Sequence, residues 1–217
     1  MSGSHVTVVD YGLGNLYSVR RACESCGAVV DVTSDAGRIA DAERLVLPGV
    51  GAFEDGMSGI RERGLVEPLQ AFAGSGRPLL AICLGMQMLA DVSEEFGSHE
   101  GLGIIRGRVV PIPDLTTSGL PHNIPRVGWT GLDAAENATW SGSPLRHTSP
   151  GTAVYLVHSY HFVCADASQL LAVSDYGGHA IASAIRAKNV VGFQFHPERS
   201  GPEGLRILSS WLTDAMA

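Results

Sequence analysis

The stretch RPLLAICLGMQMLA, residues 77–90, joins a short apolar run to what its spacing predicts is the first turn of a helix. A continuous apolar run such as 77–83 is typical of a strand buried on both faces of a parallel sheet. Cys83 stands at the corner between the two predicted elements, and Gly85 follows it two residues later. Because glycine has no side chain, we expect Gly85 to let the backbone pass close to a neighbour.

Strand-like and helix-like segments alternate through the first half of the chain. The predicted strands are residues 6–10, 28–32, 44–49 and 77–83. The predicted helices are residues 14–26 and 54–73, the second with a break near Gly64 and Pro68. This alternation predicts an α/β fold of three layers, with a mixed, mostly parallel central sheet and helices on both faces.

The second half changes character, because apolar runs follow one another with only short polar or glycine-rich breaks. These runs lie at residues 102–110, 153–163, 170–177, 180–186 and 190–195. We expect them to add antiparallel strands to the sheet. Residues 202–216 place Leu205, Leu208 and Trp211 on one stripe, which predicts a C-terminal helix that covers one sheet face.

Composition excludes several classes of function. With 45% hydrophobic and 17% charged residues, the 217-residue chain fits one globular domain, residues 1–217. A formal net charge of −7 and the lack of a basic stripe disfavour a nucleic-acid partner. No apolar run reaches the roughly 20 residues that cross a bilayer, and no signal peptide is evident, so we expect a cytoplasmic protein without membrane contact.

Four cysteines are too sparse for a disulfide framework. Cys23 and Cys26 have C-x-x-C spacing, but they fall in a predicted helix without a second ligand pair, so we expect no metal site there. The histidines show no ligand spacing either.

Cys83 is a candidate nucleophile. A residue on a sharp strand-to-helix turn is held clear of the sheet, and the first N–H groups of the helix stabilise a thiolate. The candidate base is His196, expected to be exposed at a strand end before Pro197, with Glu198 able to lie beside it. At the carboxyl edge of one sheet, these residues would supply nucleophile, base and orienting acid. The alternative is a buried structural cysteine.

A glycine-containing turn, LPGVGAF at residues 47–53, follows another predicted strand. Gly49 and Gly51 permit backbone conformations closed to other residues, so an N–H group could turn towards a developing oxyanion. A plain strand-to-helix connection is the alternative.

Six motifs occur in order along the chain. They are DYGLGNLYSV (10–19), LPGVGAF (47–53), CLGMQ (83–87), VGW (127–129), VHSY (157–160) and FQFHPERS (193–200). Together they resemble the class I, or triad-type, glutamine amidotransferases, and within that class the glutaminase subunits of imidazole glycerol phosphate synthases. The resemblance implies a flavodoxin-like fold, hydrolysis of L-glutamine without a cofactor, and a heterodimer with a (β/α)₈ cyclase subunit that receives the ammonia for histidine biosynthesis.

The resemblance also implies roles for individual residues. Cys83 would attack glutamine, His196 would move protons, and Glu198 would orient His196. The oxyanion donors would come from Gly49, Val50, Gly51 and Leu84. The residues that hold the amino-acid end of glutamine would be Gln87, Glu95, Ser159 and Tyr160; a carboxylate such as Glu95 can pair with the α-ammonium group. The partner surface would include Asn15, Arg126, Trp129 and Arg199.

Some of these residues also have a purely structural interpretation. Gln87 could be a polar residue on a helix, Glu95 part of a solvated face, and His158 a hydrogen-bonded structural histidine. The chain also departs from the usual family pattern, which has glycine at Ala81, histidine at Arg126, asparagine at Thr130 and lysine at Arg199.

Because of these departures, the sequence leaves more than one acceptor for the ammonia. The first alternative is a paralogous amidotransferase that supplies ammonia for amino sugars of surface polysaccharides. A catalytically silent binding module and a cysteine peptidase of the same fold are further alternatives.

Overall fold

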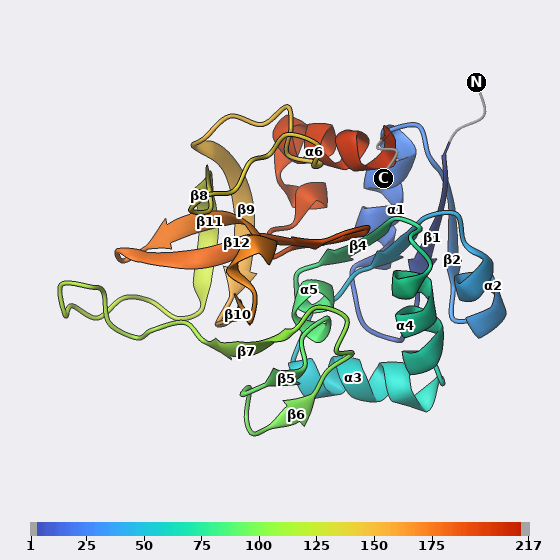
Figure 1. Ribbon diagram of the computed structural model, residues 1–217, viewed down its shortest axis with the longest axis horizontal. Helices are drawn as coiled ribbons and strands as arrows, with labels where there is room; N and C mark the ends of the chain where they lie inside the picture. The colour runs from blue at the N-terminus through green and yellow to red at the C-terminus, as the bar shows by residue number, and fades with distance from the viewer. Residues whose placement is uncertain (1–3, 214–217) are drawn as a thin grey trace.

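Nine strands form the main sheet of the computed structural model, which describes residues 4–213 (Figure 1). Their order across the sheet is β2-β1-β3-β4-β13-β12-β11-β8-β9. The strands are β1 (His5–Val9), β2 (Val29–Thr33), β3 (Leu45–Leu47), β4 (Leu79–Ile82), β8 (Arg126–Ala134), β9 (Thr152–His158), β11 (Leu170–Tyr176), β12 (His179–Ala187) and β13 (Val190–Phe193). With helices packed on both faces, the predicted α/β class with a mixed central sheet is confirmed.

The parallel part of the sheet positions three loops together. Strands β3, β4 and β13 are direct neighbours and run in the same direction. All four residues of β4 are buried, as expected for an apolar run covered by helices on both sides. Because carboxyl ends of parallel strands share one edge of a sheet, the segments that follow these strands meet there.

The second half of the chain pairs differently from the prediction. β13 was expected to be antiparallel, but it runs parallel to β4 and lies in the middle of the sheet. The run 153–163 is divided at Ser159 into β9 and β10 (Tyr160–Cys164). β10 and β7 (Gly107–Pro111) leave the main sheet and form a second sheet with β5 (Val92–Ser93) and β6 (His99–Glu100).

Two groups of helices cover the main sheet (Figure 1). One face carries α2 (Ala36–Asp41), α3 (Phe53–Glu62), α4 (Val66–Gly74) and α5 (Leu84–Met88). The other face carries α1 (Leu16–Ser25) and α6 (Gly201–Thr213), so the predicted C-terminal helix covers a sheet face as expected; residues 214–216 of that prediction lie outside the described range. Two short 3₁₀ turns, η1 (Ala167–Gln169) and η2 (Pro197–Arg199), complete the elements.

The predicted break in the 54–73 helix falls between α3 and α4. No helix within residues 4–213 is both long enough and apolar enough to cross a membrane.

Candidate active site

Cys83 occupies a strained elbow between β4 and α5. Its backbone has φ 54° and ψ −110°, in the left-handed region that residues with a Cβ avoid, at a cost of about 1–3 kcal/mol. Its N–H donates to the Phe193 carbonyl at 2.7 Å, and its own carbonyl accepts from Gln87 N at 3.2 Å to begin the helix. Gly85 packs so closely on β3 that a Cβ there would collide with the Leu47 carbonyl oxygen, which explains the glycine.

His196 and Glu198 form a buried pair. His196 Nδ1 lies 2.8 Å from Glu198 Oε1, and the two side chains are 5% and 2% exposed. The expectation that His196 is exposed was wrong: β9 packs against its segment, and His196 N–H donates to the Tyr155 carbonyl at 3.0 Å. Since the carboxylate accepts the Nδ1 proton, Nε2 is left as the reactive ring nitrogen.

Electrostatics favour a proton on His196. Burial lowers the pKa of its imidazole, but interactions with Cys83 and Glu198 outweigh burial and raise it to about 10. Nε2 is buried and has no hydrogen-bond partner within residues 4–213, so it is available to exchange a proton with the thiol. The structure thus brings together the side chains of the three residues that the sequence analysis proposed as nucleophile, base and orienting acid.

A cavity of about 290 Å³, near the lower limit for small-molecule sites of about 300 Å³, opens over Cys83. It is lined by Val50, Gly51, Cys83, Leu84, Gln87, Glu95, Pro125, Val157, His158, Ser159, Tyr160 and His196. Gly51 has φ 105°, a conformation that favours glycine. Gly49 does not line the cavity. A Cβ at Gly49 would come within 2.6 Å of the Tyr11 hydroxyl and within 2.8 Å of Gly85 N, so this close packing requires glycine.

All four residues predicted to hold glutamine line this cavity. Gln87 Nε2 donates to the Tyr160 carbonyl at 2.9 Å and to Gln194 Oε1 at 3.0 Å. Glu95 Oε2 accepts from Phe53 N at 2.6 Å, at the start of α3. The carboxylate therefore has a fixed position at the cavity wall, which disagrees with the alternative that Glu95 belongs to a solvated face.

His158 is a buried histidine at the cavity wall, hydrogen-bonded through Nδ1 to the Tyr160 carbonyl at 2.9 Å. Because a carbonyl only accepts, Nδ1 carries the proton and Nε2 is an unprotonated acceptor. Burial lowers the pKa of His158 to about 4, so the ring is neutral near pH 7.

Two residues of the site had no predicted role. Tyr11 donates its hydroxyl to the Pro48 carbonyl at 2.8 Å and so holds the 47–53 turn; burial, followed by the charge of Cys83, raises its pKa. Gln194 places Nε2 at 3.7 Å from Cys83 Sγ. A signal for Gln194 exists in the sequence, because it is the single polar side chain in the apolar run VVGFQF, residues 190–195.

Three of the residues predicted for a partner surface are exposed, and one is not. Trp129 is 59% exposed and packs its edge against Tyr155, whose ring lies 4.5 Å from the Arg199 guanidinium. We call Trp129, Tyr155 and Arg199 the aromatic-arginine cluster. Asn15 is exposed and accepts from Ser18 N, so it caps α1.

Arg126 corrects the prediction, because it is 5% exposed. Its guanidinium points inward and donates to Ser174 Oγ at 2.8 Å, to Thr130 Oγ1 at 2.7 Å and to the Asp175 carbonyl at 2.9 Å. These acceptors on β8 and β11 hold the charge inside the protein, and burial lowers the pKa of Arg126. Arg126 therefore stabilises the packing of β8 against β11 and does not contribute to an exposed partner surface.

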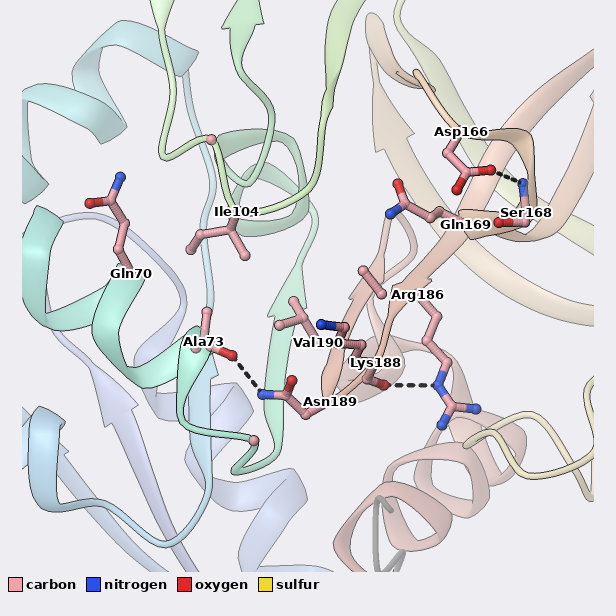
Figure 2. A pocket seen from close by; sticks show the side chains of 14 residues that line it. Gln70, Ala73, Ile104, Asp166, Ser168, Gln169, Arg186, Lys188, Asn189 and Val190 are labelled. Carbon is pink, nitrogen blue, oxygen red and sulfur yellow. Dashed lines mark hydrogen bonds between the residues drawn. The ribbon is translucent and has the colours of Figure 1, made fainter.

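A second, larger cavity of about 730 Å³ lies at the opposite, amino end of β13 (Figure 2). Several of its polar side chains hydrogen-bond to the surrounding backbone. Asn189 donates to the carbonyls of Ala73 and Arg77, and Arg186 donates to the Lys188 carbonyl, as Figure 2 shows for Ala73 and Lys188. No group of three metal-ligating side chains occurs within residues 4–213. The Cys83 cavity is therefore the candidate active site.

This fold and site define a known class of enzyme. The sequence model of class I glutamine amidotransferases matches residues 7–215. The chain belongs to the class I glutamine amidotransferase family.

Its relatives narrow the class further. The chain is 46% identical over 210 residues to imidazole glycerol phosphate synthase subunit HisH 1 of Legionella pneumophila (strain Lens), covering 96% of this chain and 99% of that protein. It is 45% identical over 208 residues to imidazole glycerol phosphate synthase subunit HisH of Syntrophotalea carbinolica, covering 95% and 98%. The solved structure of PurLQS from Thermotoga maritima shares the fold, with a TM-score of 0.73 and 20% identity over 98% of both chains.

Proposed function

We propose that this chain is the glutaminase subunit of an imidazole glycerol phosphate synthase in histidine biosynthesis, and that it works in the cytoplasm. One observation carries the chemistry: a cysteine at a strained elbow lies at the same cavity as a buried histidine, whose Nδ1 is held 2.8 Å from a carboxylate. The similarity to HisH subunits over nearly the whole chain supports the pathway.

In the first half of the reaction, Cys83 Sγ attacks the carboxamide carbon of glutamine. His196 Nε2 accepts the thiol proton and delivers it to the nitrogen that leaves as ammonia. The carbon–nitrogen bond breaks and a thioester on Cys83 remains. Between the two proton transfers the imidazolium is stabilised by Glu198, which holds Nδ1 at 2.8 Å.

In the second half, water attacks the thioester carbon while His196 takes a proton from this water. The carbon–sulfur bond then breaks, His196 returns the proton to the sulfur, and glutamate leaves with the Cys83 thiol restored. Both halves pass through a tetrahedral oxyanion. Leu84 is the first residue of α5, so its N–H has no partner within the helix and can donate to the oxyanion. Backbone N–H groups of Val50 and Gly51 are the other candidates, and one such donor is worth about 3 kcal/mol.

The amino-acid end of glutamine would lie against Gln87, Glu95, Ser159 and Tyr160. Glu95 Oε2 accepts a hydrogen bond from Phe53 N, and Oε1 would pair with the α-ammonium group of glutamine.

The ammonia would pass to a (β/α)₈ cyclase subunit in a heterodimer. The aromatic-arginine cluster fits such a partner surface, since tryptophan, tyrosine and arginine are typical anchors of protein interfaces, and Trp129 and Arg199 are exposed. Tyr155 also connects this surface with the site, because its carbonyl accepts from His196 N.

The amino-sugar paralogue rests on the two departures at Arg126 and Thr130. The structure supports another reason for them: the two side chains hydrogen-bond to each other at 2.7 Å, and Arg126 is buried. A joint change at two contacting positions keeps the inside of the protein satisfied without any change of partner. This argument favours the histidine pathway.

The proposal is tested with Cys83→Ala and the matched control Cys164→Ala. Cys164 lies outside the Cys83 cavity, and burial raises its pKa to about 11, so its loss should leave glutamine hydrolysis and labelling by a glutamine-analogue electrophile unchanged. Cys83→Ala should abolish both, while the complex with a histidine-pathway cyclase still uses free ammonia.

Each alternative has its own outcome. Stimulation of glutaminase activity only by an amino-sugar synthase would move the chain to the paralogue. Absence of hydrolysis with either partner would indicate a silent binding module, and cleavage of peptides would indicate a peptidase.

A further inference from the structure

Gln194 is a fully buried polar side chain beside the nucleophile. Its residue is 0% exposed, and the rings of its neighbours Phe193 and Phe195 stack on each other at 4.6 Å. Gln194 does not line the cavity, so it is not placed to contact a substrate directly. A buried amide without partners costs several kcal/mol, so its hydrogen bonds decide which way it points.

A backbone carbonyl fixes the direction of this amide. The Tyr160 carbonyl can only accept, so the atom of Gln87 that lies 2.9 Å from it is the amide nitrogen. The same nitrogen lies 3.0 Å from Gln194, so the Gln194 atom that faces it is the acceptor oxygen. The other end of the Gln194 amide is therefore its NH₂ group, and this group lies 3.7 Å from Cys83 Sγ.

We propose that Gln194 is a positioning residue that stabilises the thiolate form of Cys83 by donating a hydrogen bond from Nε2 to Sγ. The inference deepens the proposed function and rests on Cys83 being the nucleophile. A hydrogen bond to a charged acceptor is about twice as strong as one to a neutral acceptor, so this donor favours the thiolate over the thiol.

The surroundings of Sγ give this donor a specific role. The Val157 carbonyl lies 3.9 Å from Sγ and can accept from the thiol, so it favours the protonated form. The titratable side chains whose pKa values respond to Cys83 are His196, which is paired with Glu198, and Tyr11, whose hydroxyl donates to the Pro48 carbonyl. Before the attack on glutamine, while Cys83 is a thiolate, Gln194 is an uncharged donor beside the sulfur in addition to the protonated His196.

Two substitutions separate this role from simple packing. Gln194→Met keeps the volume and removes the donor. Gln194→Glu keeps the shape and the acceptor for Gln87, but it presents a carboxylate oxygen to the sulfur. The readout is the pH midpoint of Cys83 alkylation by iodoacetamide, followed by mass spectrometry of the Cys83 peptide, so that it needs no glutaminase activity.

We expect Gln194→Met to move the alkylation midpoint up by about one pH unit, and Gln194→Glu to move it up by at least as much. Glutaminase kcat should fall about tenfold, with KM within twofold. If Gln194 only supported Gln87, the conservative Gln194→Glu variant would keep the original midpoint. That result would overturn the inference.

A measurement on the unchanged chain covers the case in which the variants do not fold. The side-chain amide proton signal of Gln194 in nuclear magnetic resonance should shift with the same pH midpoint as alkylation of Cys83. A signal that is insensitive to this titration would overturn the inference. Failure of iodoacetamide and of a glutamine analogue to label Cys83 at all would instead count against the proposed function.

Discussion

Replacing Cys83 by glycine should make the protein more stable than replacing it by alanine. Both changes remove the thiol, so both should abolish glutamine hydrolysis, and they differ only at the backbone. With φ 54° and ψ −110°, alanine keeps the strain of the native elbow, whereas glycine adopts this conformation freely.

The magnitude follows from two opposing terms. Relief of the strain is worth about 1–3 kcal/mol, and the greater freedom of glycine in the unfolded chain costs about 0.4–1 kcal/mol. The net gain of Cys83→Gly over Cys83→Ala is therefore about 1 kcal/mol in the free energy of unfolding. For a chain of 217 residues this corresponds to about 2–4 °C in Tm.

The assay is thermal unfolding of both variants, followed by circular dichroism. Ala81→Gly is the matched control, because Ala81 lies buried in β4 without a positive φ. There the same loss of a methyl group should lower Tm. A Cys83→Gly variant that melts at or below Cys83→Ala would refute the idea that the elbow stores strain for the sake of the nucleophile.

Three further predictions concern the base, its surroundings and the partner surface. His196→Ala should reduce kcat nearly as much as Cys83→Ala does, whereas Glu198→Gln should reduce kcat less. The double variant Cys83→Ala/His196→Ala should be no slower than the single variants. If its loss of kcat instead equalled the product of the two single losses, the two residues would not act as one catalytic unit. His158 is neutral when folded, with a pKa near 4 against about 6.5 unfolded, so the free energy of unfolding should fall as pH drops from about 6.5 to 4. His158→Asn should reduce the change of the free energy of unfolding with pH in this range by about 1.4 kcal/mol per pH unit, the value for one proton. Urea unfolding at several pH values measures this slope. Arg199→Glu should weaken binding of the cyclase by about 2–5 kcal/mol in calorimetric titration if its acidic partner is buried, and unchanged affinity would separate the aromatic-arginine cluster from the interface.

Local signals predicted the parallel half of the fold. A strand buried on both faces must be apolar throughout, and this property made β4 recognisable from residues 77–83 alone. The pairing of later strands is decided by distant partners, and an apolar run does not reveal its neighbour. For this reason the direction of β13 and the departure of β7 and β10 into a second sheet could not be read from the sequence.

The same distinction holds for the site. The nucleophile and the 47–53 turn follow strands that the sequence shows, so their meeting could be predicted from the shared sheet edge. Burial of His196 and Arg126 depends on β9 and β11, which come from other parts of the chain. A charged residue such as Arg126 is usually exposed, and only the acceptors on β11 reveal that this one is not.

Backbone hydrogen bonds to neighbouring strands hold the proposed nucleophile and base in place. Cys83 N–H is bonded to the end of β13, and His196 N–H is bonded to Tyr155 on β9. Tyr155 is also the centre of the aromatic-arginine cluster, with Trp129 and Arg199 on its ring. A partner that binds this cluster and moves the main chain of Tyr155 would also move the carbonyl that accepts from His196 N. Binding at the surface and proton transfer at the thiol then share one residue, and a change in partner affinity through Arg199 should be accompanied by a change in kcat.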